Sequence, residues 1–157
     1  MGEVVASSIF SPIPMSIKQT ATRLKNITVQ KQLKKLEEII QETNEVVLDL
    51  NRGQLMQGVD ASGLSLGSYK SEWYAKMKRT LNPRGVVDLK LTGSFHDNFF
   101  VASEVPLIIF SYDEKASDLV AKYGKEIFGL TEDSRKVYLI GYVRPRFAEF
   151  QKELLGL

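Results

Sequence analysis

The feature that most constrains the fold is a run of apolar residues spaced alternately by three and four positions in the first third of the chain. This spacing puts apolar side chains on one face of a helix, so it predicts a long amphipathic helix from Ile17 to Asn51. Asn26 or Thr28 can divide it into a short and a long helix. Its apolar face would pack against a sheet or a partner helix. That face comprises Leu33, Leu36, Ile40, Thr43, Val47 and Leu50.

Shorter elements, separated by turn residues, are predicted in the rest of the chain. Asp60-Ala61-Ser62-Gly63 is a turn sequence, so residues 58–70 are expected to form a hairpin-like loop. The run at 107–110 is the most apolar in the chain and is typical of a central strand. In order, we expect a helix at 71–81, a strand at 86–91, strands at 99–101 and 105–112, a helix at 113–122, and a last helix that begins at Thr131.

The last helix has a predicted buried face of its own. Glu132 and Asp133 lie in its first turn, where negative charge suits the helix dipole. Pro145 lies inside the pattern, and we expect it to kink or divide the helix because proline has no N–H to donate. The predicted buried face comprises Val137, Ile140, Val143, Phe147, Phe150 and Leu154.

Together these elements predict an α+β fold, with the long N-terminal helix and the C-terminal helix packed on a small antiparallel sheet. A chain of 157 residues suits one domain, which we place at 17–157. Residues 1–16 are interpreted as an extended arm, since Pro12 and Pro14 block a regular helix or a central strand. The arm needs a partner surface, either on a neighbouring subunit or on its own domain, for its apolar residues Ile9, Phe10, Ile13 and Met15.

Composition excludes several classes of protein. The 21 basic and 19 acidic residues nearly cancel, which does not suggest a general nucleic-acid coat protein. The absence of cysteine excludes disulfides, thiolate metal sites and cysteine nucleophiles. No apolar run approaches the ~20 residues of a membrane span, and the first residues lack the features of a signal peptide. We therefore expect a protein made and used in the cytoplasm.

No residue pattern points to catalysis. His96 is the only histidine, and beside Asp97 it is expected to be a surface or half-buried polar group. Gly93-Ser94 lacks the glycine spacing of a nucleophile elbow, and Gly67-Ser68-Tyr69-Lys70 lacks the lysine and hydroxyl pattern of a phosphate loop. We therefore expect no enzyme, no cofactor and no metal site. The scattered acids with turn or cap roles are Asp60, Asp88, Asp97 and Asp113.

Residues 70–90 form a local basic segment with six basic against two acidic residues. Trp73 and Tyr74 are interleaved with the basic residues. One interpretation is contact with phosphates, either of DNA in a channel or of a stacked single strand. The other is an amphipathic helix with a solvated basic face and an aromatic core face. The candidate DNA-facing residues are Lys70, Lys76, Lys78, Arg79 and Arg84.

Three stretches together carry a resemblance to a known family. Tyr74-Ala75-Lys76-Met77-Lys78 follows the predicted hairpin, Leu89-Lys90-Leu91-Thr92-Gly93-Ser94-Phe95 is followed by Asn98, and Tyr123-Gly124 leads to Ile127-Phe128-Gly129-Leu130. In order and spacing they resemble the virion-morphogenesis and tail-completion proteins of tailed bacteriophages, over roughly residues 50–135. Two positions depart from the family pattern: Asn98 stands where serine is usual, and Phe95 where leucine is usual. The motif residues are Leu91, Thr92, Gly93, Phe95, Asn98, Phe128 and Gly129.

The resemblance implies a structural virion protein without catalysis. Members of that family join the head to the tail or complete the tail, commonly as rings around the DNA channel. The implied partners are copies of the same chain, other neck, portal or tail proteins, and genomic DNA in the channel. The implied location is the neck or upper tail of a virion assembled in the host cytoplasm. The alternative is a small DNA-binding module that uses residues 70–90. In either case Gly93 would permit a tight turn, and Thr92 would bond the backbone there.

Overall fold

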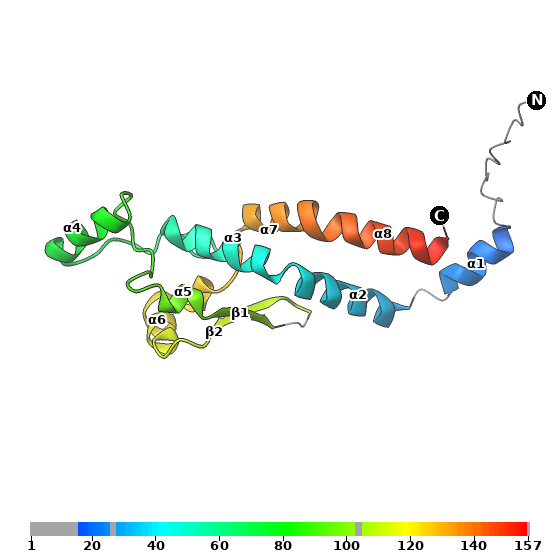
Figure 1. Cartoon of the computed structure of the whole chain (residues 1–157), viewed down its shortest axis with the longest axis horizontal. Coiled ribbons are helices and arrows are strands. Elements are labelled where there is room, and N and C mark those ends of the chain that lie inside the picture. The colour runs from blue at the N-terminus through cyan, green and yellow to red at the C-terminus, as the bar shows by residue number, and fades with distance from the viewer. Residues whose placement is uncertain (1–15, 26–27, 103–104, 157) are drawn as a thin grey trace, which may run out of the picture.

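The computed structural model describes residues 16–25, 28–102 and 105–156. The fold is α+β, as expected: mostly helical, with one small antiparallel hairpin. The molecule is elongated, with α2 and α3 following one another along its length and the C-terminal helices alongside them (Figure 1). Most of the predicted arm lies outside the described residues, including Ile9, Phe10, Ile13 and Met15.

The predicted N-terminal helix is three helices: α1 (Ile17–Lys25), α2 (Val29–Glu42) and α3 (Asn44–Met56). The break near Thr28 is confirmed, and the Thr28 hydroxyl caps α2 by accepting the N–H of Lys31 at 3.3 Å. A second break at Thr43 was not predicted. The Thr43 hydroxyl donates to the Ile39 carbonyl at 2.6 Å, a local bond that bends helices. Helix α3 also continues past the predicted end at Asn51.

The predicted apolar face of these helices is largely confirmed. Ile40, Thr43 and Val47 are buried, whereas Leu33 is 40% exposed. Helix α3 lies between the hairpin and α7, and α2 lies against α8. Because α3 touches both the hairpin and the C-terminal helices, it forms the centre of the core.

The C-terminal helical segment begins, as predicted, after the N-cap Thr131, whose hydroxyl accepts the N–H of Ser134 at 3.2 Å. It consists of α7 (Glu132–Tyr138), a π-helical turn η2 (Leu139–Val143) and α8 (Arg144–Leu155). The wider turn lies directly before Pro145, which confirms the prediction that the helix changes there.

The predicted buried face of this helix is wrong in its first half. Val137 and Ile140 are 55% and 62% exposed, while Tyr138 is 4% exposed and bonds the Thr43 hydroxyl at 2.8 Å. A π-helical turn carries an extra residue, so it rotates the helix before it relative to the helix after it. The downstream positions Val143 and Phe147, also predicted to be buried, are half-buried.

The hairpin consists of β1 (Phe99–Ala102) and β2 (Ile108–Ser111), paired antiparallel with Phe100 opposite Phe110. Both strands were predicted. Phe99 and Ile109 are buried on the face toward α3. The expectation of a central strand at 107–110 is wrong, because the sheet has two strands among the described residues, and Ile108 and Phe110 are 39% and 41% exposed.

The remaining elements are α4 (Glu72–Leu81), α5 (Ser94–Asp97), α6 (Ala116–Tyr123) and the 3-10 turn η1 (Lys125–Ile127). The loop before α4 is closed by a single bridge between Val59 and Ser65, in agreement with the predicted hairpin-like loop. Within the described ranges, no helix has the length and apolar character needed to cross a membrane. The core cluster consists of Val47, Leu48, Leu55, Phe95, Phe99, Ile109, Ile127, Leu130 and Tyr138.

Candidate functional site

The candidate site is organised by α4, whose boundaries match the predicted helix. The hydroxyl of Ser71 caps its first turn by accepting the N–H of Tyr74 at 3.3 Å. Asn82 ends it, immediately before Pro83. The last turn of α4 points Lys78 into the protein, where its side chain is 2% exposed.

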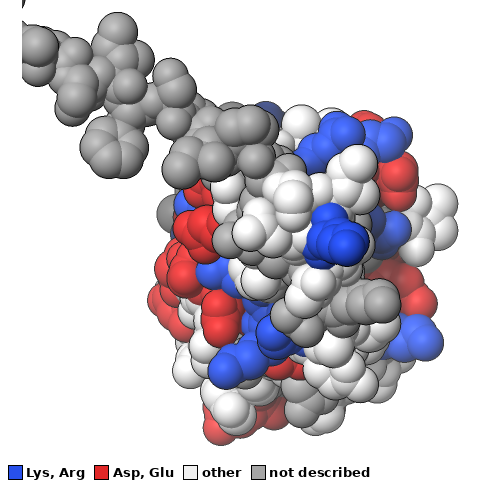
Figure 2. Space-filling view, turned by 90° about the vertical axis from the view of Figure 1, so that its right-hand side faces the viewer, with Lys and Arg blue, Asp and Glu red and all other residues white. Residues whose placement is uncertain are grey.

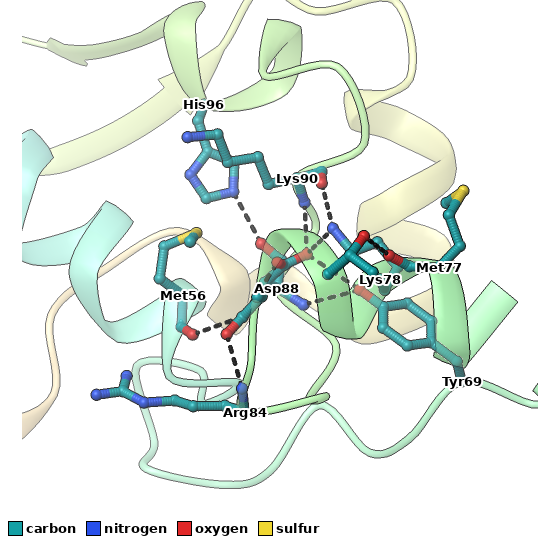
Figure 3. A network of polar contacts seen from close by, with 10 residues as sticks. Met56, Tyr69, Met77, Lys78, Arg84, Asp88, Lys90 and His96 are labelled. Atoms are coloured by element: carbon teal, nitrogen blue, oxygen red, sulfur yellow. Dashed lines mark hydrogen bonds and ion pairs between the residues drawn. The ribbon is translucent and has the colours of Figure 1, made fainter.

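Lys78 forms a buried ion pair with Asp88. The Lys78 ammonium lies 2.7 Å from a carboxylate oxygen of Asp88, which is also 2% exposed. The ammonium donates a second bond to the carbonyl of Lys90 (Figure 3). Burying two charges is costly unless both are paired and hydrogen-bonded, and these partners meet that condition.

Asp88 is the centre of a network that joins three segments of the chain. Its carboxylate accepts bonds from the Tyr69 hydroxyl at 3.0 Å, the Asn82 amide at 3.1 Å and the backbone N–H of Lys90 at 3.0 Å. Burial opposes ionisation of Asp88, but these donors and Lys78 outweigh it and hold its pKa below the usual value. Burial raises the pKa of Tyr69, so that its phenol remains a donor.

The network explains why residues 86–91 do not form the predicted strand. The N–H of Asp88 bonds to the Tyr69 hydroxyl at 3.3 Å, and the carbonyl of Lys90 accepts from Lys78, so side chains satisfy this backbone. Leu89 has a φ of 53°, which a strand residue does not adopt. The alternation of Val87, Leu89 and Leu91 therefore belongs to a loop.

His96 is buried, at 4% exposed, which corrects the expected surface or half-buried position. Its Nε2–H donates to the Asp88 carbonyl at 2.9 Å, and its ring stacks on Phe99 with centroids 5.4 Å apart. Burial lowers the pKa of His96, so the ring is held neutral. His96 therefore has a structural role next to the Asp88 loop.

The Thr-Gly motif forms a tight turn into α5. Gly93 has a φ of 102°, and the Thr92 hydroxyl accepts the N–H of Ser94 at 3.3 Å, as the sequence predicted for both residues. The Asn98 amide donates to the Ser94 carbonyl at 2.9 Å, so this bond joins the residue after α5 to the first residue of α5. The Ser94 hydroxyl donates to Asp113 and lowers the pKa of that carboxyl. These bonds tie the turn to the loop before α6.

The other motif residues lie beneath this turn. Phe95 is buried and packs against Phe99 and Phe128, with ring centroids 4.9 and 5.8 Å away. The carbonyl of Gly129 accepts the Gln54 amide at 2.7 Å, which links this segment to α3. The structure therefore brings Phe95 and Phe128 together in the core, whereas Leu91 is 56% exposed.

A cleft of about 730 Å³ opens between α4, the Thr-Gly turn and α6. We call it the α4–α6 cleft. Its lining includes the apolar residues Leu66, Val87, Leu89, Leu91, Phe95 and Leu119. Four lysines, two acidic residues and three tyrosines also line it: Lys70, Lys90, Lys115, Lys122, Asp113, Glu114, Tyr69, Tyr74 and Tyr123. An apolar lining in which lysines outnumber carboxylates suits a ligand or partner segment that combines apolar and acidic groups.

The basic segment is divided by the structure. Lys78 is buried in the ion pair, which corrects its assignment as a DNA-facing residue. Lys70, Lys76, Arg79 and Arg84 are exposed. Trp73 is also exposed, at 73%, so the expected aromatic core face of this helix is wrong at that position.

Some polar side chains at the cleft or beside it are bonded to structural partners. Ser94 donates to Asp113, and Tyr69 donates to Asp88. His96 bonds the Asp88 carbonyl. Among the described residues, no three His, Asp or Glu side chains gather where they could hold a metal ion. The bonds of Tyr69, Ser94 and His96 fix the Asp88 loop and the Thr-Gly turn.

Sequence reasoning missed Asp88 as the centre of the site. In a strand at 86–91, Asp88 and Lys90 would lie on the polar face and point to solvent. A polar residue between Val87 and Leu89 is typical of the solvent face of a strand. The neighbouring residues do not distinguish such a residue from a buried aspartate. The partners Tyr69, Lys78 and Asn82 come from 19, 10 and 6 positions away, and only the fold brings them together.

No family model matches the chain, and comparisons with curated proteins and with solved structures likewise find no match.

Proposed function

We propose that the chain is a structural virion protein of a tailed phage, a neck or tail-completion component that forms part of a ring at the head–tail junction or upper tail. Its role in this proposal is assembly rather than catalysis. Its partners are further copies of itself and other neck, portal or tail proteins.

The observation that carries the proposal is the apolar surface along α2 and the C-terminal helices. Val29 on α2 is 66% exposed, and Leu139 and Ile140 on the π-helical turn are 47% and 62% exposed. Soluble monomers rarely expose large contiguous apolar patches, which usually mark interaction surfaces. A groove of about 460 Å³ runs along this surface. It is lined by Leu36, Leu139, Ile140, Val143, Arg144, Phe147, Ala148 and Gln151.

This surface suits contact with a second copy. The groove is lined by Leu36 of α2 and by residues of η2 and α8, which lie against α2, so a helix of a neighbour can add a third layer. If the contact joins different surfaces of the two copies, repetition with a closing rotation gives a ring. The resemblance of residues 50–135 to tail-completion proteins supports the same assembly.

A stop codon in the gene, in the phage that carries it, tests the function. We expect particles examined by negative-stain electron microscopy to fall into separate heads and unattached tails. A plasmid copy of the intact gene should restore joined particles. Normal infectious virions from the stop-codon phage would contradict the proposal.

A second candidate function, a small DNA-binding module, is favoured by the exposed face of α4. Trp73 is 73% exposed, and Lys76 and Arg79 are exposed one and two turns further along. Bases stack on exposed aromatic rings while basic side chains contact the phosphates. Binding of a duplex or single-stranded DNA probe that weakens steeply with added salt would support this function, and no binding at low salt would remove it.

A further inference from the structure

Two stretches of this nearly neutral chain carry local charge of opposite sign. Residues 36–51 contain five acidic residues and no lysine or arginine. Residues 70–90 contain six basic and two acidic residues. Viewed from the end that carries α1, several acidic side chains gather along one side of the molecule (Figure 2).

The acidic surface is a stripe along α2 and α3. Glu38 and Glu42 are four residues apart on α2, and Glu45 and Asp49 are four residues apart on α3, so each pair shares a helix face. All four are exposed, and the side chains of Glu45 and Asp49 are 72% and 74% exposed although Arg52 lies within 3.4 and 3.0 Å of them. We call these four residues the acidic stripe. Surface pairs of this kind are weak, so they leave the carboxylates available to a partner.

The basic surface lies at α4. The buried pair of Lys78 and Asp88 removes one charge of each sign from the surface and leaves five exposed basic residues against Glu72. None of these five forms an ion pair within the described part of the chain, unlike most of the acidic stripe. We call them the basic surface: Lys70, Lys76, Arg79, Arg84 and Lys90.

We propose that the acidic stripe of one copy docks on the basic surface of the next, so that copies associate head to tail through unlike surfaces. This inference rests on the proposed ring-forming function and specifies its interface. Complementary charges fix the register of the two copies and disfavour contacts of like charge. Because the two surfaces differ, each copy keeps one of each free for a further neighbour, as a ring requires.

A charge-swap experiment on the purified full chain tests the interface. One variant carries Glu42→Lys and Glu45→Lys, and the other carries Lys76→Glu and Arg79→Glu. Self-association is measured by sedimentation velocity at about 0.1 M and about 1 M salt, where the screening length falls from about 10 Å to about 3 Å. We expect the wild-type chain to associate more strongly at low salt. Each variant alone should associate at least about tenfold more weakly, since attraction is replaced by repulsion.

The decisive sample is the equimolar mixture of the two variants. We expect it to recover association, because each variant supplies the surface that the other can bind. A control with Glu149→Lys and Glu153→Lys on the exposed side of α8 makes the same charge change elsewhere and should associate like the wild type. Circular dichroism checks that every variant is folded.

Three results would overturn the inference: a wild-type chain that remains monomeric at every concentration, a mixture that does not recover association, or a control that loses association equally. If the mixture fails while Lys76→Glu with Arg79→Glu abolishes binding to a duplex DNA probe, the basic surface serves nucleic acid instead. The stop-codon phage reports on the neck function separately, so failure of this interface is distinguishable from failure of the proposed function.

Discussion

At the scale of single residues, the buried pair of Lys78 and Asp88 determines the shape of the candidate site. Both side chains are 2% exposed, and together with Tyr69 and Asn82 they replace the hydrogen bonds of a strand. Removing one partner of such a pair leaves an uncompensated charge in the interior. The pair therefore connects the end of α4 to the loop that carries the Thr-Gly turn.

Lys78→Met should lower the free energy of unfolding by about 3–5 kcal/mol, because Asp88 would stay buried without its ammonium partner. Urea denaturation followed by circular dichroism measures the change. Lys76→Met is the matched control: it removes an exposed lysine two residues away on the same helix and should change stability by less than about 0.5 kcal/mol. Similar losses in the two variants would show that the pair is not a principal support of the fold.

His96 should make stability depend on pH below its usual pKa of 6.5. Burial lowers its pKa in the folded protein, so between that lowered pKa and 6.5 the unfolded chain binds a proton that the folded chain does not. Stability therefore falls as the pH falls through this window, by up to about 1.4 kcal/mol for each unit of pKa difference.

The variant His96→Gln tests this dependence, since its amide can still donate to the Asp88 carbonyl but does not titrate. Urea midpoints measured from about pH 7 to about pH 5 should slope less in the variant than in the wild type. Because His96 is the only histidine, parallel slopes would mean that its pKa is not lowered by the fold.

At the scale of elements, caps and glycine positions set the boundaries. Thr28, Ser71 and Thr131 each accept a backbone N–H at the start of a helix, as their side chains allow. Gly93 adopts a positive φ that the turn into α5 needs, and a Cβ there would lie 3.2 Å from the Asp97 carboxylate. Gly53, by contrast, lies within α3 with open space around it.

Alanine substitutions at these two glycines should have opposite effects. Gly93→Ala should cost about 1–2 kcal/mol, because an L-residue is strained at positive φ. Gly53→Ala should add about 0.5–1 kcal/mol, because alanine favours the helix and meets no neighbour there. Thermal unfolding of the two variants beside the wild type measures both signs, and a stabilised Gly93→Ala would contradict the strained turn.

At the scale of the whole molecule, the helices form an elongated arrangement (Figure 1). Apolar side chains of α2 and the C-terminal helices remain on its surface. The π-helical turn is one cause, since it rotates Ile140 out of the buried face while Tyr138 enters the core. The groove along these helices is therefore an exposed apolar surface, whereas the acidic stripe and the basic surface are charged.

Ile140→Glu should weaken self-association without lowering the free energy of unfolding, because the side chain is 62% exposed in the single chain. Sedimentation velocity measures the first effect and urea denaturation the second. Leu64→Glu is the matched control, since Leu64 is 66% exposed on the loop before α4. Equal association of Ile140→Glu and the wild type would exclude the groove as a contact between copies.

The sequence by itself determined the features that depend on neighbouring residues. Helix periodicity, N-caps and the Thr-Gly turn act over one or two turns of chain, so the helices near Thr28, Ser71 and Thr131 and the conformation of Gly93 were predictable. The two strands of the hairpin were also predicted, from their runs of apolar residues. These features are local because hydrogen bonds between residues a few positions apart decide them.

Only the tertiary structure decided which residues are buried where the local pattern was ambiguous. Asp88 was predicted in a strand and Lys78 on a basic helix, and the fold buries both. Tyr69 and Asn82 donate to Asp88, and Asp88 and the Lys90 carbonyl bind the Lys78 ammonium. Tyr138 replaced its neighbours in the core because a π-helical turn changed the helix phase. In each case the deciding partners come from other segments of the chain, and a local sequence pattern does not specify which distant groups will satisfy a buried charge.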